Sequence, residues 1–557
     1  MNQAAHTDEK WWGWGDPGKK DNLSRHPEFI KYLSEQIDFT GKVTLPPPDV
    51  ASIKIPESRL TKKDIASLLS IVSDEKVHTS DRSRIINTYG KSYRDLLRIR
   101  KKNFDTVPDA VVFPDSEDIV QKILTWAVEN NIAIVPRGGG TSVVGGVETM
   151  CGDKNRAVIV LNLRFLNKIL HINTTSLVAD VEAGIYGPDL EDALGRKGLT
   201  LGHFPESFEY STLGGWIAAR SAGQQSTLYG KIEEMVESLR VVTPGGIIQT
   251  INVPASADGP ELKRMLIGSE GIYGIITRVR IKVKPIPEEK YYTAYLVPSF
   301  EEGTEICRRI IQSGMKPAAI RLSDEDETEF AFSLLITKMP SVKNMVLKTG
   351  RRWLERKGYL PGKRAFLLLG FEGTKTDVAH ERKKLRSFVS KYKVLHLGKS
   401  AGNRWYKQRF ANPYRRDALL DHGIMVDTLE TATEWDSIKP LYDAVIKSIT
   451  RAYDDLGIKG IAMGHLSHMY STGSSLYFIL LASPHPDKEL EEWQIIKRAA
   501  SMAIVEYGGV ISHHHGVGLD HKQWLEPTIG SESIQLLRAL KFQIDPENIL
   551  NPEKLLP

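Results

Sequence analysis

The stretch Pro136-Arg137-Gly138-Gly139-Gly140-Thr141-Ser142 directly follows the apolar segment Asn131-Ile132-Ala133-Ile134-Val135. The apolar segment predicts a short strand, and the three glycines let the backbone of the following loop approach a ligand with bare N–H groups. Backbone amides that no side chain shields form a concave donor site for an anion. The stretch therefore predicts a loop that binds phosphate groups. For three glycines alone, an ordinary tight turn stays open as an alternative.

The spacing of these glycines separates the loop from two common nucleotide-binding motifs. It lacks the Gly-x-x-x-x-Gly-Lys-Ser/Thr pattern of a Walker ATP site. It also does not open a helix in the manner of Gly-x-Gly-x-x-Gly, because Val143-Val144-Gly145-Gly146-Val147 continues as glycine-rich loop. Neither an ATP site of the Walker type nor a dinucleotide fold of the Rossmann type is predicted.

The composition is that of a globular protein of 557 residues, long enough for two or three domains. A net charge of +5 from 74 basic and 69 acidic residues gives no electrostatic case for a nucleic-acid partner. Two cysteines, Cys151 and Cys307, do not make a disulfide framework and fit a reducing compartment. We expect no spanning helix, and neither secretory, transit nor peroxisomal signals are recognised at the two ends, so a cytoplasmic location is predicted.

Short apolar strands alternate with amphipathic helices over most of the chain, which predicts an α+β fold. Thr61 to Val72 predicts a helix capped by Thr61 with Asp64 three residues on, and Ser116 to Glu129 predicts a second capped helix. Gly274 to Val283 predicts a strand that ends a domain. The expected divisions are an N-terminal helical region 1–104, a cofactor-binding domain 105–287, a cap domain 288–486 and a C-terminal helical segment 487–557.

Two further glycine-bearing segments follow the first loop in order. They are Ser211-Thr212-Leu213-Gly214-Gly215-Trp216, with a helix start expected at Ile217, and Gly268-Ser269-Glu270-Gly271-Ile272-Tyr273-Gly274-Ile275-Ile276-Thr277. Taken alone, the first of these also fits plain helix packing. Together the three ordered motifs resemble the FAD domain of the vanillyl-alcohol oxidase superfamily, in which the first loop cradles the FAD pyrophosphate.

That resemblance implies a fold and a set of cofactor-binding residues. The fold is a FAD-binding domain of two α+β subdomains with an α+β cap domain and helical N- and C-terminal segments. The implied FAD-binding residues are Pro136, Arg137, Gly138, Gly139, Gly140, Thr141, Ser142, Pro205, Ser211, Thr212, Gly214, Gly215, Trp216, Ala222, Glu270, Gly271, Gly274, Ile275 and Ile276. Family members that tether FAD covalently often carry His where Thr141 stands, which favours non-covalent flavin.

A run of three histidines, His513-His514-His515, lies near the C-terminus, and Tyr477 lies in a predicted strand. Consecutive side chains point in different directions and do not easily ligate one ion, so no metal site is predicted. Two interpretations without a catalytic role stay open: the histidines form a surface run, and Tyr477 is a core residue. Beside a flavin, however, imidazole is suited to proton transfer, because its unperturbed pKa lies near neutrality.

The whole chain resembles the alkylglycerone-phosphate synthase family, also called alkyl-dihydroxyacetonephosphate synthase. The matching motifs are Trp12-Gly13-Trp14-Gly15, Gly90-Lys91-Ser92-Tyr93-Arg94-Asp95-Leu96, Glu209 to Trp216, Ala319-Ile320-Arg321-Leu322, Glu430-Thr431-x-x-x-Trp435-Asp436 and Ser512 to Gly518. The resemblance implies exchange of the acyl group of acyl-dihydroxyacetone phosphate for a fatty alcohol, without net oxidation. It implies catalytic roles for Tyr477, His514, His515 and Arg321, with His513 beside them. We also expect a homodimer and peripheral contact with a membrane.

One segment departs from that family. Leu519-Asp520-His521 stands where the synthases typically show Lys-Leu-Arg. The segment is similar to the Gly-Glu-His-Gly-x-Gly-Leu region of FAD-linked D-lactate dehydrogenases and glycolate oxidase subunits, which implies hydroxyacid oxidation as the alternative activity. The second metal-ligand histidine of those dehydrogenases would fall at Thr472, so their metal site is not predicted. A flavin-binding protein without turnover is a third reading.

Overall fold

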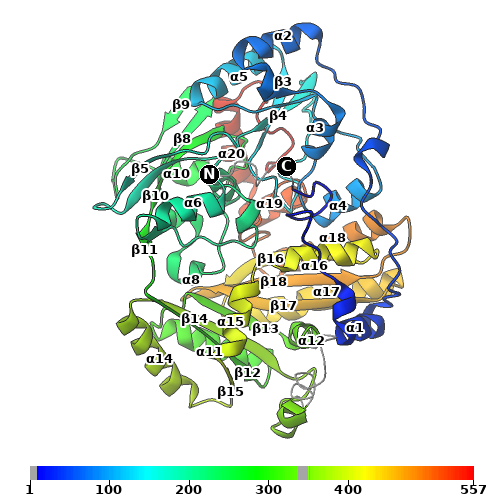
Figure 1. Cartoon of the computed structure of the whole chain (residues 1–557), viewed down its shortest axis with the longest axis vertical. Helices are drawn as coiled ribbons and strands as arrows, with labels where there is room; N and C mark the ends of the chain where they lie inside the picture. Colours follow the sequence, from blue (N-terminus) through cyan, green and yellow to red (C-terminus); the bar gives the residue numbers. More distant parts are fainter. Residues whose placement is uncertain (1–8, 336–348, 351) are drawn as a thin grey trace.

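The structure is a computed structural model that describes residues 9–335, 349–350 and 352–557. Figure 1 shows two smaller sheets with their helices in the upper half of the molecule and a larger sheet across the lower half. The C-terminus lies in the upper half, near the two smaller sheets (Figure 1). The chain therefore passes through the upper half, builds the lower half, and returns.

The first sheet carries the glycine loop. Its strand order is β1-β2-β4-β3, and β2, β4 and β3 run parallel. The bounds are β1 (Val77–His78), β2 (Ala110–Val112), β3 (Ile132–Arg137) and β4 (Ala157–Asn162). Helix α5 (Glu117–Glu129) connects β2 to β3, and its N-cap Ser116 accepts a hydrogen bond from the N–H of Ile119. Parallel strands need such a crossover, and the glycine loop follows the carboxyl end of β3, the edge where open α/β sheets bind ligands.

The second sheet is antiparallel and holds the strands around the other two glycine-bearing segments. Its order is β5-β6-β10-β8-β9. The strands are β5 (Ile169–Asn173), β6 (Val178–Glu182), β8 (Val236–Thr243), β9 (Gly246–Gln249) and β10 (Ile275–Lys282), and β7 (Leu199–Thr200) pairs separately with β11 (Lys284–Pro285). The helices between them are α6 (Gly187–Gly195), α7 (Leu213–Ala219), α8 (Ser226–Tyr229), α9 (Ile232–Met235) and α10 (Leu262–Leu266).

The third sheet is antiparallel and has the order β15-β12-β14-β13-β17-β18-β16. Its strands are β12 (Glu289–Val297), β13 (Ala319–Ser323), β14 (Ala365–Gly373), β15 (Leu395–Gly398), β16 (Met425–Glu434), β17 (Gly460–Met469) and β18 (Gly473–Ala482). The helices in its connections are α11 (Phe300–Gln312), α12 (Glu325–Ser333), α14 (Lys375–Val389), α15 (Lys399–Gln408), α16 (Asn412–Asp421) and α17 (Ile438–Leu456). Residues directly opposite on such strands share one face of the sheet.

Helical segments at both ends of the chain join the sheets together. They are α1 (Pro27–Ile37), α2 (Lys62–Ile71), α3 (Asp81–Ile86), α4 (Tyr93–Arg100), α18 (Glu489–Glu506), α19 (Lys522–Ile529) and α20 (Ser531–Ile544), with 3₁₀ turns η2 (Leu23–Arg25), η3 (Val50–Ser52), η4 (Asp74–Lys76) and η5 (Phe208–Tyr210). The N–H of Ile134 donates to the carbonyl of Ile549 at 2.7 Å. The end of the chain thus pairs beside β3, next to the glycine loop.

The structure confirms most of the predicted elements and corrects one. Thr61 and Asp64 form the predicted capping box of α2, and β10 covers the predicted strand. The helix start expected at Ile217 is wrong, because α7 already begins at Leu213. Thr212 caps that helix by accepting from the N–H of Gly215, a signal that the two glycines obscured.

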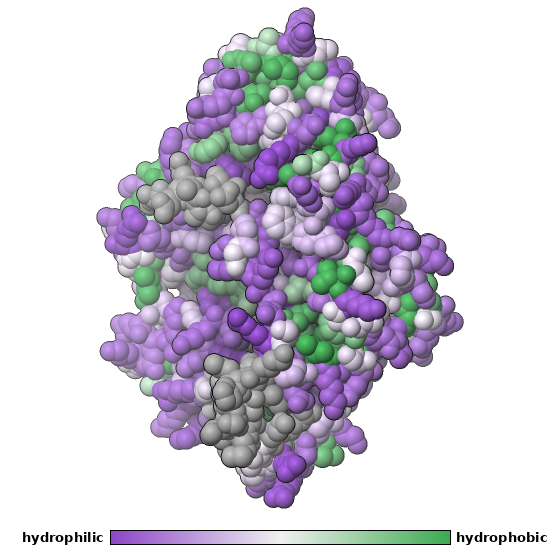
Figure 2. Space-filling view, turned by 45° about the vertical axis from the view of Figure 1, so that its right-hand side comes forward, coloured by the Kyte–Doolittle hydropathy of each residue, from purple (hydrophilic) through white to green (hydrophobic). Residues whose placement is uncertain are grey.

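The surface is polar with scattered apolar side chains. Figure 2 shows hydrophilic residues over most of one face and several separate hydrophobic patches. Among the described residues, no helix is both long and apolar enough to cross a membrane.

Candidate active site

The glycine loop packs against the second glycine-bearing segment, which explains two of its glycines. A Cβ at Gly139 would overlap the carbonyl of Tyr210, and one at Gly138 would overlap the hydroxyl of Thr212. Across the described residues, the backbone N–H groups from Gly138 to Val143 have no hydrogen-bond acceptor. A run of unpaired amides at the end of a strand fits a bound anion such as a pyrophosphate.

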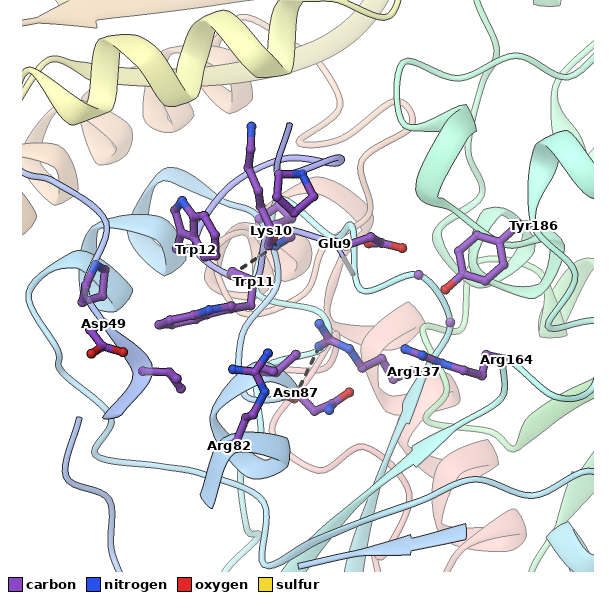
Figure 3. A pocket seen from close by; sticks show the side chains of 17 residues that line it. Glu9, Lys10, Trp11, Trp12, Asp49, Arg82, Asn87, Arg137, Arg164 and Tyr186 are labelled. Carbon is purple, nitrogen blue, oxygen red and sulfur yellow. Dashed lines mark hydrogen bonds between the residues drawn. The ribbon is translucent and has the colours of Figure 1, made fainter. Parts of the chain in front are cut away.

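A pocket of about 480 Å³ borders this loop (Figure 3). Five basic side chains line it: Lys10, Arg82, Lys91, Arg137 and Arg164. Figure 3 places Trp11 and Trp12 on one side and Tyr186 on the other. Burial lowers the pKa of Arg137 to about 10 and that of Lys91 to about 8. Cations held in such a buried place suit an anionic ligand, so the residues fit the dinucleotide end of FAD.

The N-terminal segment forms one wall of this pocket, which the sequence did not predict. The buried ammonium of Lys91 donates to the carbonyl of Lys10 at 2.8 Å and to that of Trp11 at 3.2 Å. Farther along, the N–H of Trp14 donates to the carboxylate of Asp417 at 2.6 Å. The aromatic motif Trp12-Gly13-Trp14-Gly15 was the available signal, but it did not indicate what the segment would cover.

The remaining predicted cofactor residues fall into two groups. One group surrounds the glycine loop: a Cβ at Gly271 would overlap Pro136, so the third motif also packs there. The members of the other group are mostly buried. Trp216 donates its indole N–H to Ser211 at 2.6 Å inside the core of the second sheet. Pro205, Ser211, Thr212, Ala222, Gly274, Ile275 and Ile276 are buried, Arg137 and Gly140 are buried in the loop, Thr141, Ser142 and Gly214 are partly buried, and Gly215 is exposed.

Glu270, one of the predicted cofactor residues, also joins two segments of the chain. Its carboxylate accepts hydrogen bonds from the backbone N–H groups of Val517 and Gly518. Burial raises the pKa of Glu270 to about 7, although those two bonds oppose the rise. Glu270 therefore ties the third glycine-bearing segment to the end of the histidine run.

The third sheet places two of the predicted catalytic residues, Tyr477 and Arg321, on one face. Tyr477 on β18 lies directly opposite Glu430 on β16 and directly opposite His465 on β17. His465 is in turn opposite Ser323 on β13, and Arg321 lies two residues before Ser323. Because opposite residues and those two apart along a strand share a face, Arg321 and Tyr477 face the same side.

Arg321 belongs to a buried charge cluster. Its Nη2 donates to Glu327 Oε1 at 2.5 Å and lies 3.1 Å from His465 Nδ1. Burial disfavours the charge on Glu327, but Arg321 and His465 outweigh it and hold the pKa of Glu327 below its usual value. The ring of His465 stacks on Tyr477 with centroids 4.8 Å apart. The cluster therefore connects the arginine to the tyrosine through His465.

The histidine run lies in the loop after α18, where Glu430 organises it. The backbone N–H of His515 donates to Glu430 Oε1 at 2.8 Å, and that of His514 donates to the same oxygen at 3.1 Å. The N–H of His513 donates to Oε2, and the hydroxyl of Ser512 donates to Oε1 at 2.7 Å. One fully buried carboxylate thus satisfies four donors and fixes the backbone that carries the three histidines, of which His514 and His515 lie beside Tyr477.

Burial keeps these imidazoles neutral. It lowers the pKa of His513 and of His514 well below the ordinary value, and it lowers that of His515 despite the nearby Glu430. Burial, with Glu206 and Glu430 adding to it, raises the pKa of Tyr477. The rings of His514 and His515 lie 6.1 and 5.5 Å from that of Tyr477. The site therefore holds a protonated phenol beside neutral imidazoles, each of which keeps one unprotonated ring nitrogen.

Three carboxylates of this site were not predicted as functional. Glu430 and Glu327 anchor the histidine run and Arg321, and Glu206 lies close enough to Tyr477 to raise its pKa. Burial raises the pKa of Glu206, and its Oε1 has no hydrogen-bond partner within the described ranges. Glu430 stood in one of the motifs that match the synthase family and Glu206 directly follows Pro205, but only the tertiary structure shows what these carboxylates contact.

The same region contains a group that could hold a metal ion, formed by Glu430, His513 and His514, whose ligand atoms lie within 4.8 Å of one another. Hydrogen bonds already account for this arrangement, since Glu430 accepts four donors and the two Nδ1 atoms of the histidines lie 3.0 Å apart. The absence of a metal stays a prediction.

The segment Leu519-Asp520-His521, which differs from the pattern of the synthase family, is buried near a cluster of arginines. Asp520 Oδ1 lies 3.1 Å from Nη1 of Arg94, which also pairs with Glu148 at 2.6 Å. Burial raises the pKa of Asp520 to about 6, against the effect of Arg94. His521 is buried and its Nδ1 lies 3.3 Å from the carbonyl of Gly516. The segment therefore supports the histidine loop from below.

Comparisons with known proteins agree with this geometry. Residues 108–252 match the family described as "FAD binding domain", and residues 286–555 match "FAD linked oxidases, C-terminal domain". The chain is 33% identical to an alkyldihydroxyacetonephosphate synthase of Trypanosoma brucei brucei, over 100% of this chain and 94% of that protein. It is 32% identical to the synthase of Dictyostelium discoideum, over 98% and 93% of the two chains.

This chain belongs to the alkyldihydroxyacetonephosphate synthase family. A solved structure of an alkyldihydroxyacetonephosphate synthase superposes with a TM-score of 0.84 at 29% identity and covers 99% of both chains. A 4-ethylphenol oxidase from Gulosibacter chungangensis, 15% identical, shares the fold with a TM-score of 0.67. The predicted vanillyl-alcohol oxidase-type α+β fold is confirmed, and so are the synthase family and FAD as the cofactor.

Proposed function

We propose that this synthase-family protein exchanges the acyl group of acyl-dihydroxyacetone phosphate for a fatty alcohol, with no net oxidation. The observation that carries the proposal is the meeting of Tyr477, His514 and His515 beside the Arg321 cluster on one face of the third sheet. Full-length identity to synthases of 33% and 32% supports the same reading.

The first glycine loop is proposed to hold the pyrophosphate of FAD through the N–H groups from Gly138 to Ser142, with Arg137 and Arg164 nearby. Thr141 in place of a tethering histidine favours non-covalent attachment. When bound, FAD supplies an electron-accepting ring that lets an exchange at carbon finish without net redox change.

The proton chemistry is assigned to Tyr477 and its imidazole neighbours. Because burial favours the neutral phenol, Tyr477 removes a proton from substrate only as a neighbouring imidazole takes the phenolic proton. His514 and His515 are neutral and next to the ring, so either can accept it. The same groups return the proton when the alcohol oxygen replaces the departing carboxylate.

Arg321 is proposed to bind an anion of the substrate. Its Nη2 is taken by Glu327 and His465, whereas neither Nε nor Nη1 has a partner in the described part of the chain. The arginine is 24% exposed, so the free edge of its fork can reach a carboxylate or a phosphate.

Hydroxyacid oxidation is the second candidate, favoured by the Leu519-Asp520-His521 segment and by 27% identity to the glycolate oxidase subunit of Bacillus subtilis over 89% of this chain. The two readings separate in one experiment. Purified FAD-loaded protein is given acyl-dihydroxyacetone phosphate and hexadecanol, and in parallel D-lactate or glycolate without oxygen. Ether product and free fatty acid from wild type, with none from Tyr477→Phe or His515→Ala, support the synthase. Flavin bleaching by a hydroxyacid at catalytic rates would overturn it.

The lipid nature of these substrates leads us to propose peripheral contact with a membrane and a homodimer in the cytoplasm. Leu536 and Phe542 on α20 are 66% and 70% exposed, and Arg538 lies on the same helix. Exposed apolar side chains on a helix that also carries a cation suit an anionic bilayer surface. Flotation with vesicles and sedimentation of the purified protein test the two points. The division into domains at residues 104, 287 and 486 also remains our proposal.

A further inference from the structure

The histidine run is connected to the protein surface by hydrogen bonds that the proposed chemistry does not by itself require. His514 Nδ1 lies 3.0 Å from His513 Nδ1, and His513 Nε2 lies 2.7 Å from the hydroxyl of Tyr470. Tyr470 in turn lines a hollow of about 440 Å³. Three groups in a row therefore lead from the ring beside Tyr477 to that hollow.

The hollow opens to solvent. Its other lining residues include Glu434, Thr472 and Tyr507, all exposed, and Tyr507 is 50% exposed. The hollow lies at the tip of the β17–β18 hairpin, and among the described residues it shares no lining residue with the pocket next to the glycine loop. Water in the hollow can reach Tyr470 without entering the cofactor pocket.

The three groups are held in place by bonds to their backbones. The N–H of Tyr470 donates to the carbonyl of Gly473 at 2.8 Å, and the carbonyl of Tyr470 accepts from the indole of Trp435 at 3.1 Å. The carbonyl of His513 accepts from Lys231 Nζ at 2.7 Å, and Glu430 accepts from its N–H. A row of donors and acceptors with fixed geometry can pass a proton without large movements.

We propose that His513 and Tyr470 form a proton path between His514 and solvent in this hollow. The proposal rests on the proposed function, because a proton taken from the substrate must leave the buried site and later return. Outward transfer balances as follows. Tyr470 releases its hydroxyl proton to water and takes the proton of His513 Nε2, His513 takes the proton of His514 Nδ1, and His514 takes one at Nε2 from the reacting centre.

Every group in this scheme accepts one proton and releases one, so each is neutral before and after. That feature suits the site, because burial disfavours a lasting charge on any of the three. The path also separates two roles among the histidines: His514 and His515 contact Tyr477, whereas His513 contacts Tyr470.

The test compares two tyrosines that line the same hollow. In FAD-loaded protein, Tyr470→Phe removes the last link of the path, whereas the matched control Tyr507→Phe removes an exposed hydroxyl with no histidine partner among the described residues. Because turnover requires proton transfer, we expect Tyr470→Phe to lower the turnover rate about 10- to 100-fold. It should also raise the solvent deuterium isotope effect, with the flavin spectrum and melting temperature kept. Full turnover by Tyr470→Phe would overturn the path.

Chemical rescue separates a proton path from a structural role. Tyr470→Ala opens the hollow toward His513, and imidazole is small enough to enter a hollow of about 440 Å³. Imidazole in the buffer should restore the turnover of Tyr470→Ala in a saturable manner and leave wild type unchanged. Lack of rescue, with imidazole bound in the hollow, would count against the path.

A failure of the proton path can be distinguished from a failure of the proposed function. Wild-type turnover alone decides between synthase and hydroxyacid oxidation, and both need proton removal, so the variants are compared on whichever substrate wild type uses. If wild type used neither, the proposed function would fall. The path would then be judged by proton uptake after light-driven reduction of bound flavin, followed with a pH-indicator dye. Slower uptake in Tyr470→Phe supports the path, and equal uptake overturns it.

Discussion

The carboxylate of Glu430 accepts a hydrogen bond from the backbone N–H of His515 at 2.8 Å, and the same carboxylate lies directly opposite Tyr477 in the sheet. One side chain thus sets the distance between the strand that carries the tyrosine and the loop that carries the histidines. The buried carboxylate accepts from four donors at once.

Glu430→Gln should therefore disturb the histidine run. The amide keeps one acceptor oxygen and turns an NH₂ group toward buried N–H donors, each of which costs about 1–3 kcal/mol when left unpaired. We expect a lower melting temperature and a loss of at least about tenfold in kcat/KM. Glu434→Gln, an exposed position on the same strand, is the control and should behave as wild type. Unchanged activity in Glu430→Gln would contradict the organising role.

Arg321→Lys tests the charge cluster. Lysine keeps the charge but loses the planar fork that reaches Glu327, His465 and substrate together. A lost charged hydrogen bond is worth about 1.5–3 kcal/mol, or roughly a 10- to 100-fold fall in kcat/KM. Arg309→Lys, exposed and paired with Glu305 on α11, is the matched control. Recovery of Arg321→Ala by added guanidinium would identify the lost fork as the cause.

Gly139→Ala tests the glycine loop. The new methyl group would overlap the carbonyl of Tyr210, so the loop must move away from the segment before α7. We expect the purified variant to contain less than about half of the wild-type flavin, measured by absorbance after denaturation. Gly195→Ala in α6 places its added Cβ more than 4 Å from any atom of the described residues outside its own turn and should be neutral or stabilising by up to about 1 kcal/mol. Normal flavin content in Gly139→Ala would contradict the cradle.

His468→Asn tests the pH dependence of stability. Burial lowers the pKa of His468 to about 3, so the folded protein keeps it neutral while the unfolded chain protonates it below about pH 6.5. The free energy of unfolding therefore holds its full value above pH 6.5, and because of His468 it falls by about 1.4 kcal/mol per pH unit as the pH drops toward 3.

Asparagine suits the left-handed backbone at this position, where φ is +48°. Melting temperatures at pH 7.5 and 5.0 should fall less steeply for His468→Asn than for wild type. His171→Asn at an exposed site should keep the wild-type slope. Equal slopes for all three proteins would show that His468 is already protonated in the folded state.

Local patterns predicted the elements that depend on neighbouring residues. The capping box of α2, the cap of α5 and the strand before the glycine loop all form from contacts within a few residues. The start of α7 was misplaced because glycine is a poor helix former, yet packing and the Thr212 cap outweigh its cost here. Tertiary context overrides propensity most easily in such short helices.

The candidate active site likewise combines features that the sequence predicts with contacts that only the fold creates. The amino-acid sequence by itself determined the cofactor loop, the histidine run and the family, because ordered motifs keep their spacing along the chain whatever surrounds them. Only the tertiary structure decided that Glu430 anchors the histidines, that His465 joins Arg321 to Tyr477 and that Tyr470 meets His513. Those contacts join residues 12 to 144 positions apart, and they depend on strand register and burial, which no local pattern encodes.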